Sequence, residues 1–122
     1  MAHKFEDLRV WQISLDYLDL MYEVAAGLPT QERYNLAQQM RRAATSVSLN
    51  IAEGSTGQTD AEQNRFLGFS LRSVVETVAC LRIVQRRHYP VDPETLSQVG
   101  ELGELLAKLL QSMRRSLIRH QP

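Results

Sequence analysis

Apolar residues recur at spacings of three and four along most of this 122-residue chain, and this spacing constrains the fold more than any other feature. Such spacing places apolar side chains on one side of an α-helix. Four runs of this kind are separated by short segments that contain Gly or Pro. We therefore expect four helices, at about residues 8–26, 31–53, 60–88 and 93–119. No segment of adequate length alternates with the period of two that is typical of a β-strand.

Residues that favour helix starts lie near these boundaries. Asp7 and Thr30 precede the first and second helices, where a side-chain oxygen can accept a hydrogen bond from the free amides of the first turn. Thr59 begins a T-x-x-E capping box. Asp92 followed by Pro93 combines a capping side chain with a residue that needs no amide partner.

The connections between these helices are short, which favours antiparallel neighbours. A chain of 122 residues is long enough for one core and too short for two ordinary domains. We therefore expect a single domain over residues 1–122. Its fold class is all-α, an antiparallel up-down-up-down four-helix bundle.

The segment expected to form the first helix is apolar on two sides. One stripe consists of Leu8, Trp11, Leu15, Leu18, Tyr22 and Ala25. A second stripe, nearly opposite, consists of Val10, Ile13, Tyr17, Leu20 and Val24. An isolated bundle buries only one face of each helix, so we assign the first stripe to the core and the second to an interface with another copy of the chain. The alternative is that the second stripe points into seams between helices of the same chain.

Positive and negative charges balance, with 14 Lys and Arg against 14 Asp and Glu, so nucleic-acid binding would depend on local clusters. Twelve of the 14 cations are Arg, which suits bidentate phosphate contacts. The candidate contacts are Arg41, Arg42, Arg82, Arg86, Arg87, Arg114, Arg115 and Arg119. The alternative is that cations near helix C-termini complement the helix dipole.

Sequence patterns typical of catalysis or metal binding do not occur. No Glu is followed by His three positions later, and His3, His88 and His120 are far apart in the sequence. The single cysteine, Cys80, lies in an apolar helical pattern, which favours a buried, reduced thiol. We expect no metal, no cofactor and no enzymatic activity. The N-terminus does not have the pattern of a signal peptide, and no apolar run is long enough to span a membrane, so we expect a cytoplasmic location without a membrane partner.

Residues 39–54 form a distinctive run, QMRRAATSVSLNIAEG. Together with the residues upstream that include Phe5 and Trp11, and with Phe66-Leu67 in the third helix, this run closely resembles the bacterial family named after the 23S ribosomal RNA intervening sequence. The resemblance covers nearly the whole chain. It implies an antiparallel four-helix bundle, and known members and relatives form rings of five subunits.

The relatives of this family include the accessory proteins of diversity-generating retroelements, which associate with a reverse transcriptase and with nucleic acid. The resemblance therefore implies a homopentamer whose partners include RNA or a nucleoprotein, and it implies no catalytic activity. We expect a non-enzymatic scaffold or adaptor. One alternative is a protein that binds RNA directly through its Arg clusters, and another is a protein that binds a small ligand.

Four polar residues of the run share one helix face because they are three or four positions apart. They are Arg42, Ser46, Asn50 and Glu53, and Gly54 follows them. One interpretation is a polar binding site on this face. The other is tight helix packing with a polar helix end, in which Glu53 can pair with an Arg near the end of the fourth helix.

Overall fold

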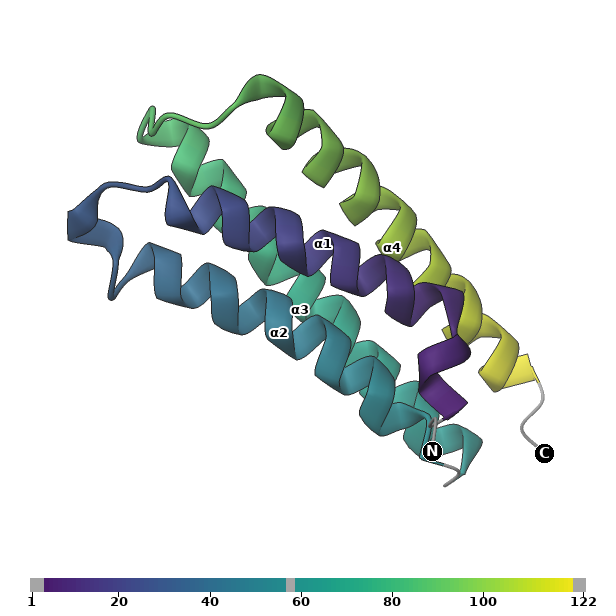
Figure 1. Ribbon diagram of the computed structural model, residues 1–122. Helices are drawn as coiled ribbons and strands as arrows, with labels where there is room; N and C mark the ends of the chain where they lie inside the picture. Colours follow the sequence, from purple (N-terminus) through teal and green to yellow (C-terminus); the bar gives the residue numbers. More distant parts are fainter. Residues whose placement is uncertain (1–3, 57–58, 120–122) are drawn as a thin grey trace.

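The computed structural model describes residues 4–56 and 59–119, and in these residues it contains four α-helices and no strand (Figure 1). The α-helices are α1 (Arg9–Ala26), α2 (Leu36–Gly54), α3 (Asp60–Arg86) and α4 (Pro93–Arg119). Two short 3-10 helices precede α1 and α2, and these are η1 (Lys4–Asp7) and η2 (Thr30–Glu32). The all-α prediction with four helices is confirmed.

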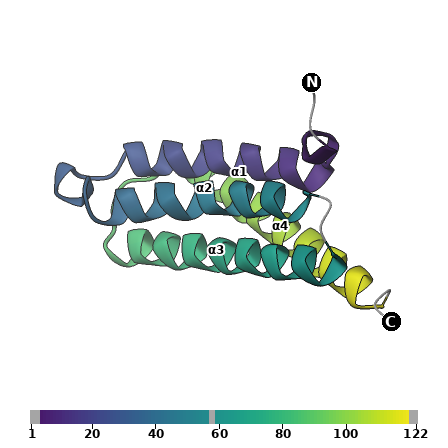
Figure 2. The same cartoon turned by 90° about the horizontal axis from the view of Figure 1, so that it is seen from below.

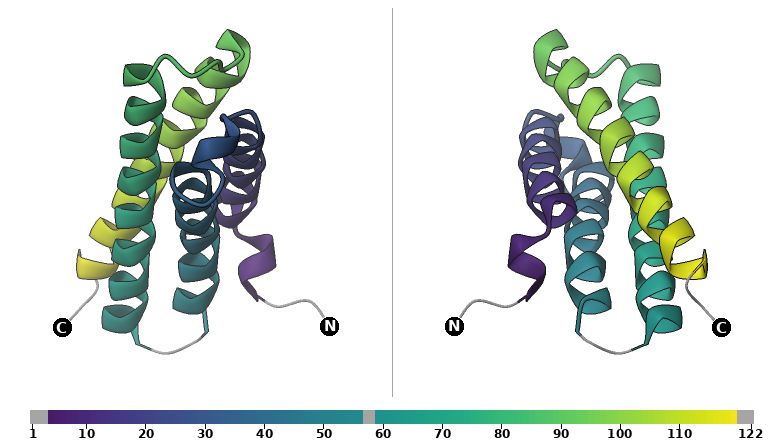
Figure 3. Two further views of the ribbon diagram at one scale, coloured as in Figure 1. Left: turned by 90° about the vertical axis from the view of Figure 1, so that its left-hand side faces the viewer. Right: turned by 90° about the vertical axis from the view of Figure 1, so that its right-hand side faces the viewer.

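The four helices lie side by side, as the views in Figures 2 and 3 show. Each helix packs against two others, in the cyclic order α1, α2, α3, α4. The α1–α2 and α3–α4 connections lie at one end of the bundle, and the α2–α3 connection lies at the other end (Figure 1). The core therefore forms between all four helices.

The predicted starts of α3 and α4 are confirmed. The Thr59 hydroxyl oxygen accepts a hydrogen bond of 3.1 Å from the Glu62 amide, as a capping box requires. At α4, the Asp92 carboxylate accepts hydrogen bonds of 3.2 Å from both the amide and the hydroxyl of Thr95. Helix α4 begins at Pro93, as the Asp-Pro pair predicts.

The predicted N-caps of α1 and α2 were wrong, although α1 begins at Arg9, within one residue of its predicted start. Asp7 belongs to η1, and the residue at the N-cap of α1 is Leu8, which makes no side-chain capping bond. Thr30 begins η2 instead of capping α2, which starts only at Leu36. Before α2, Glu32 accepts hydrogen bonds from Asn35 (3.0 Å) and from the Tyr89 hydroxyl (2.6 Å), and these bonds hold residues 30–35 in a separate turn.

Helix α3 ends at Arg86, two residues before the predicted boundary. His88 has a φ of 58°, in the left-handed region, and a helix cannot continue through that conformation. The connection to α4 begins there.

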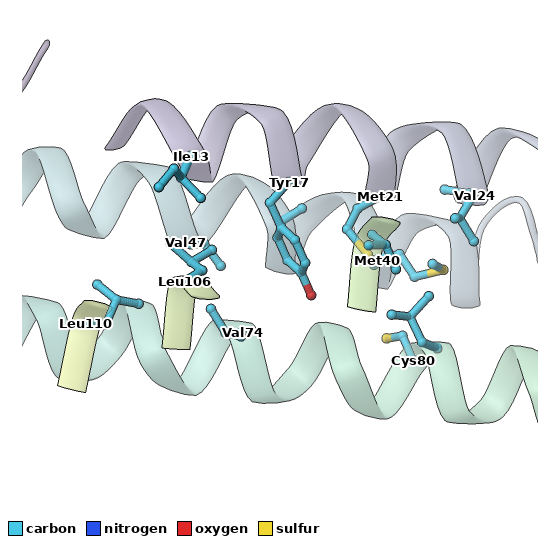
Figure 4. Close-up of a cluster of buried hydrophobic side chains, with 14 of the residues drawn as sticks. Ile13, Tyr17, Met21, Val24, Met40, Val47, Val74, Cys80, Leu106 and Leu110 are labelled. Atoms are coloured by element: carbon cyan, nitrogen blue, oxygen red, sulfur yellow. The ribbon is translucent and has the colours of Figure 1, made fainter. Parts of the chain in front are cut away.

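The assignment of the two apolar stripes of α1 was also wrong. The stripe assigned to an oligomer interface faces the core: Val10, Ile13, Tyr17 and Val24 are buried, and Leu20 packs against the core. Figure 4 shows Ile13, Tyr17 and Val24 pointing toward α2 and α3. In the other stripe, only Ala25 is buried. Of its remaining members, Leu8, Trp11 and Leu18 are partly buried at the edge of the core, Leu15 is partly buried, and Tyr22 is exposed.

Hydroxyl groups inside the core explain which face of α1 turns inward. The Thr77 hydroxyl donates to the Val74 carbonyl, so the Tyr17 hydroxyl donates to Thr77, at 2.7 Å. Ser14 and Ser48 form a second buried pair between α1 and α2, at 2.8 Å. Among the described residues, no buried side-chain nitrogen or oxygen lacks a partner. The face of α1 that turns inward is therefore the one whose hydroxyl groups find hydrogen-bond partners in the core.

Cys80 is buried in this core, as its apolar surroundings in the sequence predict (Figure 4). Burial raises the pKa of the Cys80 thiol, because the charged thiolate is poorly solvated there. The same effect raises the pKa of the Tyr17 hydroxyl. Both groups therefore keep their protons near neutral pH.

Candidate functional site

A groove of about 1110 Å³ runs along the outer face of α2, and we call it the α2 groove. Side chains from η1, α1 and α3 form its walls. The lining residues are Phe5, Tyr22, Gln38, Arg41, Arg42, Thr45, Ser46, Leu49, Asn50, Ala52, Glu53, Ser55, Thr56 and Phe66. Most of them belong to the run that carries the family resemblance.

The α2 groove contains one highly exposed leucine among polar side chains and is charged toward both ends. Leu49 lies at its centre and is 63% exposed. Arg41 and Arg42 lie about two turns before Leu49, and Glu53 lies one turn after it. Within the described part of the chain, none of these three charged side chains makes an ion pair or a side-chain hydrogen bond. The groove therefore offers an apolar contact flanked by unpaired charges of opposite sign.

The polar residues in the middle of α2 bond within the bundle. The Asn50 amide donates to the backbone carbonyl (2.9 Å) and the hydroxyl (3.0 Å) of Ser46. The Ser73 hydroxyl of α3 also donates to Ser46, at 2.9 Å. On the other side of α2, Tyr22 and Thr45 hydroxyls are 3.1 Å apart. These bonds fix both walls of the groove to α2.

The structure places four of the five residues of the predicted polar face in the α2 groove. These four are Arg42, Ser46, Asn50 and Glu53. Gly54 is instead buried against α3, where an added Cβ would lie 3.1 Å from the Cβ of Phe66. The predicted alternative, a pair between Glu53 and an Arg of α4, is absent among the described residues.

The arginines at the ends of α3 and α4 lie at opposite ends of the bundle (Figure 1). Arg82 donates to the Gln85 side chain at 3.1 Å, and Arg86 is exposed. The Arg87 guanidinium lies over the Tyr89 ring, 5.9 Å from its centroid. Hydrogen bonding to Tyr89 and the charges of Tyr89 and Glu32 raise the pKa of Arg87.

Arg114 is held inside the seam between α3 and α4. Its Nε donates to the Asn64 side chain at 2.8 Å. Its guanidinium covers Gly68, where an added Cβ would lie 3.0 Å from the Arg114 Cζ. Arg115 is exposed, and the side chain of Arg119 lies outside the described residues. Arg114 therefore has a packing role, so among the described side chains of this predicted cluster only Arg115 is exposed.

A second groove, of about 380 Å³, lies between α3 and α4, and sequence reasoning missed it. Val75 and Val78 line it from α3, and Gly100, Gly103 and Ala107 line it from α4. The signal was present in the sequence, because small residues at positions 100, 103 and 107 share one helix face. Their lack of bulk leaves the space open.

The described residues contain no group of three or more His, Cys, Asp and Glu side chains that could hold a metal ion. Of the three histidines in the sequence, His88 is exposed, whereas His3 and His120 lie outside the described residues. None of the described helices is both long and apolar enough to cross a membrane.

The fold and the groove define a class of protein, a small helical bundle whose second helix carries an exposed surface of mixed chemistry. Comparison with known families is more specific. A family model described as 23S rRNA-intervening sequence protein matches residues 6–112. The chain belongs to this family. Comparison with curated proteins gives no match.

Proposed function

We propose that the protein is a non-enzymatic, homo-oligomeric scaffold or adaptor whose subunits form a ring of five. The observation that carries this proposal is the apolar surface left uncovered on the α1–α2 side of one chain. Leu49 is 63% exposed, Tyr22 is 40% exposed and Leu15 is only partly buried. Leu49 and Tyr22 both line the α2 groove, and exposed apolar residues that lie together typically mark an interaction site.

The subunit of this proposal is an antiparallel up-down-up-down bundle. Hydrogen bonds between α1 and α2 support it, because Ser14 pairs with Ser48 whereas the later residue Tyr22 pairs with the earlier Thr45. The number of subunits in the ring, five, comes from the family resemblance. A closed ring requires that one surface of each subunit contact a different surface of the next.

Replacement of Leu49 by Asp tests the proposal. Because Leu49 is exposed and outside the core, the Leu49→Asp chain should keep its helical circular dichroism and lose its oligomeric state in sedimentation velocity. Val75→Asp is the matched control, because Val75 is also 63% exposed but lies on α3. A wild-type chain that sediments as a monomer at micromolar concentration contradicts the proposal.

A second candidate function is direct RNA binding through arginines. The observation that favours it is that Arg86 and Arg115 are exposed and make no side-chain interaction within the described residues. A ring would repeat such residues around its circumference and concentrate the positive charge. Binding through phosphates weakens steeply as salt concentration rises. Fluorescence anisotropy with a labelled RNA should then show binding at low salt that Arg86→Ala reduces, and absence of binding at low salt rejects this candidate.

A further inference from the structure

The α2 groove needs an occupant that supplies apolar side chains and acids near Arg41 and Arg42. Among the described helices, the exposed face of α3 offers Val75 and Ile83, but it also carries several arginines. Before its last turn, α4 exposes the acids Glu94, Glu101 and Glu104, but its leucines pack against the core and it exposes no large apolar side chain there. Neither helix therefore combines a free apolar side chain with acids alone.

The outer face of α1 has the required chemistry. Leu15 is partly buried and is not among the residues that pack against the core. Asp19 and Glu23 follow it at intervals of four residues, so all three share one helix face. Both acids are exposed and make no side-chain interaction within the described residues. Acids without partners on α1 and arginines without partners on α2 are complementary.

The spacing of these residues also matches along the helix axes. With a rise of about 1.5 Å per residue, Glu23 lies about 12 Å beyond Leu15. Arg42 and Arg41 lie about 10 to 12 Å from Leu49 on α2. If Leu15 of one copy contacts Leu49 of another and the two helices run in opposite directions, Glu23 reaches the arginines.

The parallel direction of the same alignment is unfavourable. If the two helices ran parallel, Glu23 would lie on the same side of the contact as Glu53, which is about 6 Å after Leu49 on α2. Like charges placed together oppose association, so the antiparallel direction is favoured.

We propose that the α2 groove receives α1 of a second copy of the chain, antiparallel, with Leu15 against Leu49 and Glu23 against Arg41 and Arg42. This inference rests on the proposed homo-oligomeric function and names the two surfaces that meet. Each subunit then contributes its α1 face to one neighbour and its α2 groove to another. The run of residues that carries the family resemblance is an assembly surface.

A charge exchange tests this register. Arg42→Glu and Glu23→Arg should each raise the dissociation constant of the assembly about tenfold or more at low ionic strength, because each places like charges together. The double variant that combines both changes should restore most of the wild-type affinity, because each interface again contains opposite charges. Sedimentation velocity over a concentration series measures all four chains. Arg42 and Glu23 are exposed, so circular dichroism should stay unchanged.

The controls separate this inference from the proposed function. Arg86→Glu and Glu94→Arg change exposed charges outside both surfaces and should leave the assembly unchanged. If the wild-type chain is a monomer, the proposed function and this inference both fail. If the wild-type chain is an oligomer that Arg42→Glu and Glu23→Arg do not weaken, or if the double variant fails to recover, only this inference fails.

Disulfide formation provides a test that does not depend on charge. A Leu15→Cys, Leu49→Cys chain should form disulfides between copies under mild oxidation, because the proposed contact brings these two positions within the range that a disulfide spans. Non-reducing electrophoresis should show a ladder of cross-linked chains. A Leu15→Cys, Val75→Cys chain serves as the control. Equal cross-linking in both chains overturns the inference.

Discussion

At the scale of single residues, the hydroxyl of Tyr17 orients α1 in the core. It donates to Thr77 across the bundle, between helices that are diagonal in the cyclic order. We expect Tyr17→Phe to lower the free energy of unfolding by about 1 kcal/mol, the usual contribution of one such hydrogen bond. Urea denaturation measures this. Tyr22→Phe removes a hydroxyl at the exposed rim and should change the stability much less.

The raised pKa of Tyr17 makes a further prediction about alkaline pH. In the folded chain Tyr17 keeps its proton above 10.0, the ordinary pKa at which the unfolded chain loses it. The folded state then binds more protons than the unfolded state, so stability falls as pH rises above about 10. Tyr17→Phe should show a shallower loss of stability over this range. An identical alkaline slope in both chains contradicts the assigned burial.

The pKa of Glu32 is lowered instead of raised, and this leads to a prediction about stability at acidic pH. Hydrogen bonds from Tyr89 and Asn35 lower the pKa of its carboxyl below the ordinary value of 4.5. The stability that this carboxylate contributes is present above that value and is lost as pH falls through the lowered pKa. Urea midpoints measured from about pH 6 to about pH 3 should therefore fall less steeply for Glu32→Gln than for the wild type.

At the scale of helices, the sequence predicts α3 and α4 better than α1 and α2. Thr59 and Asp92 act through local hydrogen bonds, so their positions in the sequence are sufficient to locate a helix start. The start of α2 depends instead on the bond between Glu32 and Tyr89, which are 57 positions apart. A contact of that kind is formed only in the folded chain, and no local pattern contains it.

The sequence prediction reversed the two faces of α1 for a related reason. Both stripes are apolar, so residue type alone cannot rank them. The distinguishing signal is on the sides between them: Ser14 and Met21 are buried on one side, whereas Asp19 and Glu23 are exposed on the other. The small and flexible residues on the first side extend the buried surface of α1 toward α2.

Two glycines of α4, Gly100 and Gly103, have different surroundings, so their replacement by Ala should change stability in opposite directions. An added Cβ at Gly100 meets nothing within 4 Å, so Gly100→Ala should stabilise the chain by about 0.5 to 1 kcal/mol through helix propensity. At Gly103 an added Cβ would lie 3.2 Å from the ring of Tyr17, which is fully buried and cannot move freely. The resulting overpacking costs about 1 to 3 kcal/mol and should outweigh the gain. Thermal unfolding of both variants tests this, and equal stabilisation would contradict the close packing at Gly103.

At the scale of the whole molecule, the candidate site was partly predictable. Arg42, Ser46 and Glu53 share one face because of helical periodicity alone, and the structure keeps them together in the α2 groove. The aromatic walls of the groove come from η1, α1 and α3, so they required the assembled bundle. The packing of Arg114 over Gly68 also required it, and this contact removes one residue from the predicted nucleic-acid surface.

We propose from the exposed apolar surface that the unit of function is the assembly. Its mass is the most direct test. Light scattering coupled to size-exclusion chromatography at micromolar concentration should give about five times the 13.9 kDa of one chain. A mass of 13.9 kDa across the whole peak would contradict the central claim, because Leu49, Tyr22 and Leu15 would then remain uncovered in the working protein.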